Sequence, residues 1–316
     1  KCTLYFSRVL KDAIVADNGG AGAIEEKGTP NFSEIATTDE GMYKAEDNDG
    51  SSYYYRGAVD NNWVQFAGFY WRIIRINGDG SIRMIYSGID SGSITDANRT
   101  GSTTTIGQSV FNEEYDQSEY AGLKYTLGEQ HGATTESTIL TKLNTWYNES
   151  MKSYEKVIDT KAKFCIDREV RSSDTWYSMG GSFFYAAYDR LSKGTPTLNC
   201  SNENDILEIP VGLITADEAA IAGGKHGTNN SDYYLNVGAF QWTMSPFYYN
   251  KDYSSILFEG AFASTYLITN NGKLGNNDAV AFTAHTRPVI NLHSDVTISS
   301  GNGTSTNPYQ IEEIID

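Results

Sequence analysis

The amino-acid sequence predicts an α+β protein in which antiparallel β-hairpins dominate and two or three helices and long loop insertions interrupt them. Runs of aromatic and β-branched residues alternate with Asn-Gly and Gly-rich turns, most clearly at 63–88 and from 233 onward. Helical periodicity is confined to a few short segments. The 316 residues include 22 tyrosines and 13 phenylalanines, so a core for one large domain is available although only 39% of residues are hydrophobic.

The N-terminal region predicts a helix followed by a connector. Leu4 to Ala16 places apolar residues at helical spacing, and Asn18-Gly19-Gly20 is a helix stop. The stretch 28–52 is polar and acidic, so we expect an extended connector that ends in a turn. We therefore divide the chain into an N-terminal helix and connector, residues 1–28, and a single domain with insertions, residues 29–316.

A β-hairpin between Trp63 and Gly88 is the strongest local prediction, because two strand-like runs flank Asn77-Gly78-Asp79-Gly80. A type II′ turn centred on Gly78-Asp79 gives one largely apolar face. On that face the expected cross-strand pairs are Trp71 with Tyr86, Ile73 with Met84 and Arg75 with Ile82, while Arg72, Ser81 and Arg83 fall on the other face. We expect this hairpin at the centre of an antiparallel sheet.

Two more helices are expected inside the domain. Residues 136–158 place an apolar stripe on one face, and Thr135 or Ser137 can cap the start. The stripe consists of Ile139, Leu143, Trp146 and Tyr147. After a short buried strand at Val211–Ile214, Thr215 and Glu218 have the spacing of a capping box. Negative charge is favoured at a helix N-terminus, so this capping role explains Asp217 and Glu218 without catalysis.

The remaining segments predict strands and loops. Residues 91–109 are rich in Ser, Thr and Gly and are expected to form a surface loop. From Tyr233 to the end the chain alternates strands and turns, with a hairpin turn at Asn270-Asn271-Gly272. Alternation along 242–246 indicates a strand with one buried face. Arg287, before Pro288, is expected to be buried.

The formal net charge is −16, and Lys and Arg form no cluster, so nucleic acid and anionic lipid are excluded as partners. No run approaches the roughly 20 apolar residues of a membrane span, and we expect no direct membrane insertion. Motifs of hydrolases, zinc peptidases, P-loop proteins and dinucleotide-binding proteins are missing. The four histidines, His131, His226, His285 and His293, lack metal-ligand spacing. We therefore predict that the protein is not an enzyme.

The three cysteines, Cys2, Cys165 and Cys200, are too few for a disulfide scaffold or for a CxxC zinc site. Cys165 and Cys200 flank a loop rich in Ser, Gly and Tyr, and we favour a disulfide between them, as in secreted proteins. On the chain-entropy model such a bond stabilises by about 3–4 kcal/mol. Two buried free thiols are the alternative. Cys2 is expected to be unpaired.

An ordered set of motifs carries a family resemblance. The motifs are VGLITADEA (211–219), WTMSP (242–246), NNGKL (270–274) and RPVINL (287–292), preceded by Leu143, Asn144 and Trp146 in a helix. They resemble a large, largely uncharacterised bacterial family with W-x-x-S-P and R-P-V-I-N-L motifs. YYYRG (53–57), FAGFYWRIIRINGDGSIR (66–83) and CIDR (165–168) look like a subgroup of secreted or surface-attached proteins from Gram-positive gut bacteria, often with an N-terminal hydrophobic anchor. The resemblance covers most of the chain from about Gly28; the ordered set is specific, although each motif alone is weak.

The resemblance implies a C-type-lectin-like fold, which formylglycine-generating enzymes share. It also implies a secreted or surface-attached protein. Because the usual catalytic motifs are missing and the late segment is rich in aromatic and amide residues, we expect an extracellular, cell-surface-attached recognition or adhesion module that binds a host or bacterial surface glycan or protein. A structural or assembly subunit of a surface appendage is the alternative, and an enzyme of the formylglycine-generating type is a third. No cysteine follows Cys200, so the late reactive cysteine pair of those enzymes is missing, and Met244 replaces the Arg of the family's W-L-R-S-P motif.

Late aromatic residues are the predicted ligand-binding side chains. Residues 229–253 interleave Tyr, Phe and Trp with Asn, Asp and Ser, a composition typical of surfaces that bind carbohydrate or protein. The candidates are Tyr233, Tyr234, Trp242, Tyr248, Tyr249 and Tyr253. A place in the core is the alternative for each, and we expect Tyr248, Tyr249 and Tyr253 to be the most exposed.

No cofactor is predicted, and calcium is the one metal for which the sequence offers oxygen ligands. The candidate ligand sets are Asp47 with Asp49, and Asn276 with Asn277 and Asp278. For Arg287 we expect a structural role, in which its guanidinium pairs with backbone carbonyls or with a carboxylate such as Asp217 or Glu218.

Overall fold

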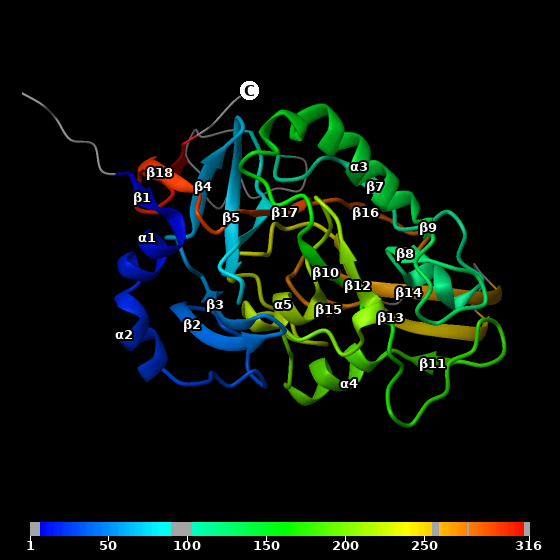
Figure 1. Ribbon diagram of the computed structural model, residues 1–316. Helices are drawn as coiled ribbons and strands as arrows, with labels where there is room; N and C mark the ends of the chain where they lie inside the picture. The colour runs from blue at the N-terminus through cyan, green and yellow to red at the C-terminus, as the bar shows by residue number, and fades with distance from the viewer. Residues whose placement is uncertain (1–6, 90–102, 255–258, 277, 313–316) are drawn as a thin grey trace, which may run out of the picture.

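The computed structural model describes residues 7–89, 103–254, 259–276 and 278–312 (Figure 1). The predicted α+β class is confirmed: most regular structure is in sheets, and antiparallel pairings predominate. The described residues contain five α-helices rather than two or three. No helix in this part of the chain has the length and apolar character needed to cross a membrane.

The larger sheet joins the N-terminal half of the chain to its C-terminal end. Seven of its nine strands follow one path, in the order β1 (Arg8–Val9), β18 (Thr297–Ser300), β19 (Tyr309–Ile311), β4 (Trp63–Phe66), β5 (Phe69–Ile76), β3 (Gly50–Gly57) and β2 (Asp39–Asp47). The other two strands, β6 (Ile82–Tyr86) and β17 (Val289–Leu292), branch from β5.

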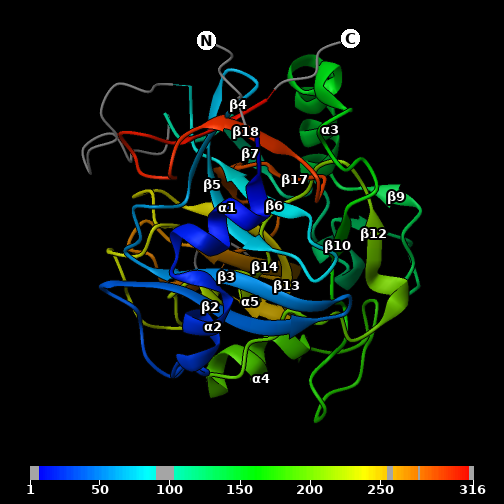
Figure 2. The same ribbon diagram turned by 60° about the vertical axis from the view of Figure 1, so that its left-hand side comes forward.

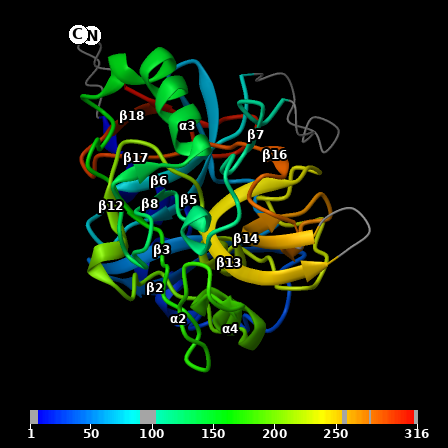
Figure 3. The same cartoon turned by 90° about the vertical axis from the view of Figure 1, so that its right-hand side faces the viewer.

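The second sheet has six strands and is built around the long hairpin of β13 and β14, seen in yellow and orange in Figure 3. Its path is β15 (Leu274–Gly275), β14 (Glu259–Ile268), β13 (Gln241–Ser254), β16 (Thr283–His285) and β7 (Gln108–Val110), with β11 (Phe183–Phe184) also on β13. Two small sheets pair β10 (Lys163–Cys165) with β12 (Ile206–Glu208), and β8 (Lys124–Tyr125) with β9 (Thr135–Glu136).

The helices are α1 (Leu10–Asp17), α2 (Gly20–Glu26), α3 (Thr138–Ser150), α4 (Ala186–Lys193) and α5 (Ala216–Ile221). Of these, α2 and α4 were not predicted. The predicted caps are present: the Ser137 side chain accepts a hydrogen bond from Leu140 N at the start of α3, and Thr215 and Glu218 form the capping box of α5. A cap of this kind stabilises a helix by about 1 kcal/mol.

The central hairpin forms as predicted near its open end, where Trp71 pairs with Tyr86 and Ile73 with Met84. The predicted register is wrong beyond Ile73, because a β-bulge shifts Arg75 opposite Arg83. The turn also differs: Gly78 and Asp79 occupy its centre, but Gly80 adopts the positive φ of +84°, which is the geometry of a three-residue loop with a terminal bulge. The bulge brings Arg75 beside Arg83.

The N-terminal segment shares its core with the rest of the chain. Leu10, Ile14 and Ile24 are buried in the same hydrophobic cluster as the β4–β6 strands. Figure 2 shows α1 and α2 beside the β2–β3 hairpin, where Glu25 of α2 forms an ion pair with Lys44 of β2. The division at residue 28 was an expectation from composition, and the described residues 7–28 pack as part of one core.

Several segments differ from their predicted conformation. Residues 39–47, predicted as connector, form the edge strand β2. Only Met42 of this strand is buried, so its sequence lacks the apolar alternation that predicts a strand. Most of the predicted loop 91–109 lies outside the described residues, and its end forms β7. Residues 242–246 are buried on both faces rather than one, because Thr243 bonds to Tyr266 O and Ser245 accepts from Ala216 N.

Candidate functional site

The predicted ligand-binding aromatics separate into buried and half-buried side chains. Tyr248 and Tyr253 are half-buried, and their rings both pack against Phe262. The other four are buried, each with at most 1% of its surface exposed, namely Tyr233, Tyr234, Trp242 and Tyr249. For those four the structure places the side chain in the core and corrects the expectation of a ligand-facing surface.

Their burial has identifiable causes. Trp242 donates its indole N–H to Ser109 O, and its ring packs edge-on against Phe111. Tyr249 donates its hydroxyl to Asp116 O, and burial raises its pKa to about 12, with a smaller effect from nearby carboxylates. A buried tyrosine or tryptophan normally satisfies its polar atom in this way. These aromatics therefore hold the second sheet together.

A surface groove lies beside the half-buried Tyr248, and we refer to it as the aromatic groove. Its volume is about 400 Å³, within the range of small-ligand sites. Its lining comes from β11, α4, β13 and the loop before β11, and consists of Arg171, Asp174, Ser182, Phe183, Phe184, Tyr188, Phe247, Tyr248, Tyr249 and Asn250. Figure 3 shows that β13 approaches α4, two of the elements that supply this lining.

Three half-buried rings supply the apolar surface of the aromatic groove. Phe184 and Tyr188 stack with centroids 4.2 Å apart, and Tyr248 lies 5.7 Å from Phe184. β11 aligns the first and third of these, since Phe184 pairs with Tyr248 across the strands. Phe247 supports all three from beneath at 4.8–5.9 Å. The rings are therefore fixed relative to one another while part of each remains accessible.

Polar groups border these rings. The Arg171 guanidinium lies over Phe184 at 4.8 Å and forms an ion pair with Asp174 at 2.8 Å. Burial would raise the pKa of Asp174, but hydrogen bonds from Phe184 N and Arg171 outweigh it and hold the pKa below its usual value. Ser182 is exposed and Asn250 half-buried at the same rim. The groove thus offers ring faces together with carboxylate, hydroxyl, amide and guanidinium groups.

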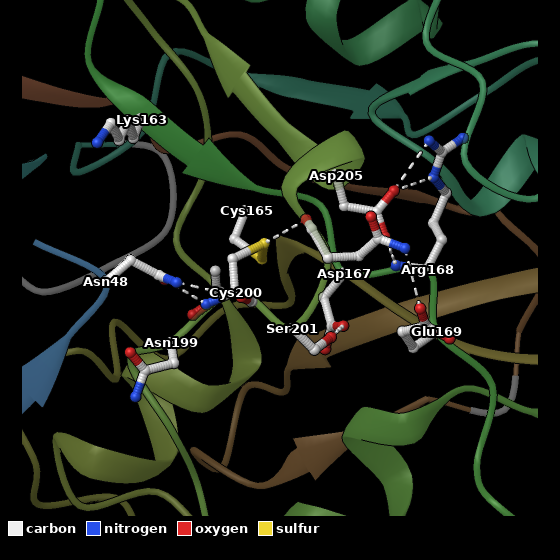
Figure 4. The surroundings of a disulfide bond; sticks show 12 residues. Asn48, Lys163, Cys165, Asp167, Arg168, Glu169, Asn199, Cys200, Ser201 and Asp205 are labelled. Carbon is white, nitrogen blue, oxygen red and sulfur yellow. Dashed lines mark hydrogen bonds and ion pairs between the residues drawn. A yellow bond between two sulfur atoms is a disulfide. The ribbon is translucent and has the colours of Figure 1, made fainter.

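A disulfide closes the loop that supplies one wall of this groove. Cys165 and Cys200 are bonded, as predicted, with a Cα–Cα distance of 5.6 Å. Figure 4 shows that Asn48 lies on one side of the bond, where it exchanges two hydrogen bonds with the Cys200 backbone, and that Asp205 and Arg168 lie on the other. Six of the groove-lining residues lie between the two cysteines.

A second hollow, the charged cavity, lies between the same loop, the hairpin and α5. It is much smaller, about 70 Å³. Six carboxylates and four cationic side chains line it: Asp47, Asp49, Asp79, Asp167, Asp217 and Glu218, with Arg75, Arg83, Lys163 and Arg190. Such a concentration of charged side chains is typical of active sites. Whether these side chains are available to a substrate depends on which groups they already contact.

The ion pairs of the charged cavity are internal. Glu218 binds Arg83 at 2.6 Å and Arg75 at 3.1 Å, and Arg75 also binds Asp47 at 2.6 Å. Burial would raise the pKa of Glu218, but the two guanidinium charges outweigh it and lower the pKa. Lys163 pairs with Asp49. Removing one partner of such a buried ion pair lowers the free energy of unfolding by about 3–5 kcal/mol.

The other half of the charged cavity is equally self-contained. Arg190 of α4 holds Asp217 through two hydrogen bonds of 2.8 and 3.0 Å and also binds Asp167. Thr197 N donates to Asp217, and Ser201 donates to Asp167. Burial raises the pKa of Asp217, although Arg190 opposes this. These carboxylates tie α5, α4 and the disulfide loop together.

Arg287 has the predicted structural role. It is 1% exposed and donates to two backbone carbonyls, Tyr86 O at 2.9 Å and Leu235 O at 3.1 Å, and to the Gln241 side chain. The backbone alternative is thus confirmed. The carboxylates proposed as the other option belong to the charged cavity.

The calcium candidates have other contacts. Asp47 and Asp49 pair with Arg75 and Lys163, so their carboxylates already face cations. Asn277 lies outside the described residues, while Asn276 donates to Thr265 O and accepts from Asp278 N. Within the described ranges, no group of three or more acidic, His or Cys side chains is arranged to hold a metal.

Comparison with known proteins adds no identification: no protein-family model matches the chain, and searches of curated proteins and of solved structures find no match. Arg171, Phe184, Tyr188 and Phe247 are groove residues that the sequence did not single out as ligand-binding. The aromatic run at 183–188, next to Gly180-Gly181, was the available signal.

Proposed function

We propose that this chain is an extracellular, non-enzymatic recognition module with a C-type-lectin-like fold, and that it binds carbohydrate at the aromatic groove. The observation that supports this most is the set of three half-buried rings, Phe184, Tyr188 and Tyr248, bordered by Arg171 and Asp174. The proposed surface attachment follows the family resemblance of the sequence.

The chemistry of the groove favours a carbohydrate. The C–H faces of a sugar ring pack on aromatic rings, and its hydroxyls require donors and acceptors at the edge of those rings. Ser182 and Asn250 supply neutral groups of this kind at the rim. A volume of about 400 Å³ accommodates one or two sugar rings rather than a folded partner.

Two other functions have less support. A subunit of a surface appendage was expected to expose the apolar face of its N-terminal helix, but Leu10, Ala13 and Ile14 of α1 are buried within this chain. An enzyme was expected to have a pocket lined by charged residues. The charged cavity fits that description in composition, yet its side chains pair with one another and the space is only about 70 Å³.

A glycan array tests the proposal directly. The protein is applied with calcium and, in parallel, with a chelator, beside a Tyr248→Ala variant and a Tyr188→Ala variant. We expect binding to a restricted set of glycans, reduced at least tenfold in each variant because one ring of the groove is lost. Calcium dependence would show whether a metal takes part.

Tyr43→Ala is the matched control, because Tyr43 is also half-buried and lies on β2, outside the groove. It should bind as the unmodified protein does. Binding to proteins or cells but to no glycan would replace carbohydrate by a protein ligand. If neither is bound, or if the Tyr43 variant loses as much binding as the Tyr248 variant, the recognition proposal is wrong.

A further inference from the structure

A third hollow shares one lining side chain, Phe247, with the aromatic groove. Its volume is about 270 Å³, somewhat below the usual range for drug-sized ligands. It is lined by the turn between β14 and β15, by the first half of β13 with the preceding Phe240, and by the loop around His226. We call it the mixed-charge pocket, because Lys273 and Asp278 both line it.

The two charges of this pocket lack partners within the described part of the chain. The side chains of Lys273 and Asp278 form neither ion pairs nor hydrogen bonds with described residues, and their charged atoms lie more than 4.0 Å from each other. The charged cavity behaves in the opposite way, since each of its cations contacts a carboxylate. The pocket is therefore lined by an ammonium group and a carboxylate that do not neutralise each other.

The rest of the lining combines apolar and neutral polar groups. Phe240 is 38% exposed, and with Phe247 it provides an apolar wall. His226 packs edge-on against Tyr188 and Tyr266, with Nδ1 3.4 Å from the Tyr266 hydroxyl. Burial lowers the pKa of His226, and the charge of Lys273 adds to this, so the imidazole is neutral near pH 7.

The backbone also leaves room for a ligand. A Cβ built on Gly275 would meet no atom within 4 Å, so the chain is open to the pocket at this point of β15. Asp278 is exposed, so its carboxylate is accessible to a ligand that enters the pocket. A ligand with an ammonium group, a carboxylate and an apolar body would match the two charged side chains and the apolar wall of this lining.

We propose that the mixed-charge pocket binds a free α-amino acid with an apolar side chain. Its carboxylate would contact Lys273, its ammonium group would contact Asp278, and its side chain would lie against Phe240 and Phe247. This site is separate from the proposed carbohydrate-binding groove and does not depend on it, although Phe247 lines both. The chain would then respond to two classes of small molecule on adjacent surfaces.

Isothermal titration with L-phenylalanine and two analogues tests this proposal. N-acetyl-L-phenylalanine lacks the ammonium group, and L-phenylalaninamide lacks the carboxylate. We expect the free amino acid to bind at least tenfold more tightly than either analogue, which corresponds to about 1.4 kcal/mol for each lost charge contact. Glycine should bind more weakly as well, because it lacks a side chain to cover the two phenylalanines.

The variants Lys273→Met and Asp278→Asn should each weaken L-phenylalanine binding at least tenfold. Lys152→Met and Asp295→Asn are matched controls, because these two side chains line none of the three hollows, and they should not alter binding. Thermal unfolding of each variant confirms that it is folded. Arg171→Met, which changes only the aromatic groove, should bind the amino acid normally even if glycan binding is lost.

Three results would overturn the proposal. One is the absence of binding by any apolar amino acid at millimolar concentrations. Another is equal binding of the two analogues and the free amino acid. The last is retention of binding in both Lys273→Met and Asp278→Asn. Because the glycan array does not involve these variants, failure here leaves the carbohydrate proposal untouched, and the reverse is also true.

Discussion

The charged cavity and the aromatic groove are both built on the disulfide-closed loop 165–200, yet their side chains are used in opposite ways. In the cavity, Arg190 and Glu218 have their hydrogen-bonding groups directed at neighbouring side chains and, for Glu218, at the backbone N–H of Thr215. In the groove, Phe184 and Tyr248 pack against each other and still expose part of their rings. The clustered charged side chains of the cavity therefore stabilise the fold, whereas the partly exposed aromatic rings of the groove leave a surface that a ligand can contact.

The difference follows from burial cost. A buried carboxylate must be paired, so each acidic group of the cavity recruits a cation or a backbone N–H and has little capacity left for a ligand. A half-buried aromatic ring needs no such partner, and burying more of its apolar surface against a ligand is favourable. The comparison predicts that cavity variants lose stability, while groove variants lose binding.

The largest effect on stability is expected for Glu218→Gln. The substitution removes the charge that faces Arg83 and Arg75, leaving two buried guanidinium groups undercompensated. We expect the free energy of unfolding to fall by about 3–5 kcal/mol, measured by urea denaturation. Glu136→Gln is the control, because the exposed Glu136–Lys124 pair at 3.9 Å should contribute less than about 1 kcal/mol. Equal losses in the two variants would contradict a structural role for the cavity.

The disulfide connects the two regions, and its removal should affect both. Replacing Cys165 and Cys200 together by Ser should lower the free energy of unfolding by about 2–4 kcal/mol, because the 35-residue separation is no longer bridged in the unfolded chain. Glycan binding should fall too, since the loop supplies Phe184 and Tyr188. Unfolding and array measurements on the same preparation check this. Unchanged glycan binding would mean that the groove does not need the closed loop.

A groove variant should lose glycan binding and retain most of its stability, the opposite of a cavity variant. Arg171→Met removes a guanidinium that lies over Phe184 and pairs with the half-buried Asp174, and both contacts are at the surface. We expect a stability loss of about 1 kcal/mol or less, together with a clear loss of glycan binding. A loss of several kcal/mol in urea denaturation would instead make Arg171 a structural residue like those of the cavity.

The pH dependence of stability should also differ between cavity and groove variants. The pKa of Glu218 is lower in the folded protein than its usual value of 4.5, so its ion pairs stabilise fully above that pH. This contribution is lost as the pH falls through the lowered folded pKa. The difference in unfolding free energy between the native protein and Glu218→Gln should therefore shrink on acidification below 4.5. For Tyr248→Ala, which removes no ion pair, the difference should change much less over the same range.

The sequence predicts different features in the two regions. The capping box and the central hairpin are local, so spacing alone located Glu218 and the paired strands. The bulge after Ile73 depends on packing and is not encoded in the apolar pattern, and without it Arg75 could not be placed beside Arg83. The ion cluster was therefore invisible in the sequence, although its members stood in predicted elements.

The groove shows the complementary limit. Tyr248 was identified from an aromatic segment, but the same reasoning selected Tyr249, which alternation in β13 turns into the core. Phe184 and Tyr188 belong to a different stretch of chain, and only the pairing of β11 with β13 brings them to Tyr248. Composition thus finds ligand-type residues, whereas sheet register decides which of them share a surface.

Hydrogen–deuterium exchange with the best glycan from the array is the most direct test of the contrast between groove and cavity. The chain is compared alone and with the glycan in excess. We predict protection in peptides covering 171–188 and 247–250, with unchanged exchange in those covering 75–83 and 215–218. Protection confined to the segments of the charged cavity would contradict the assignment, because the ligand would then occupy the site that we interpret as structural.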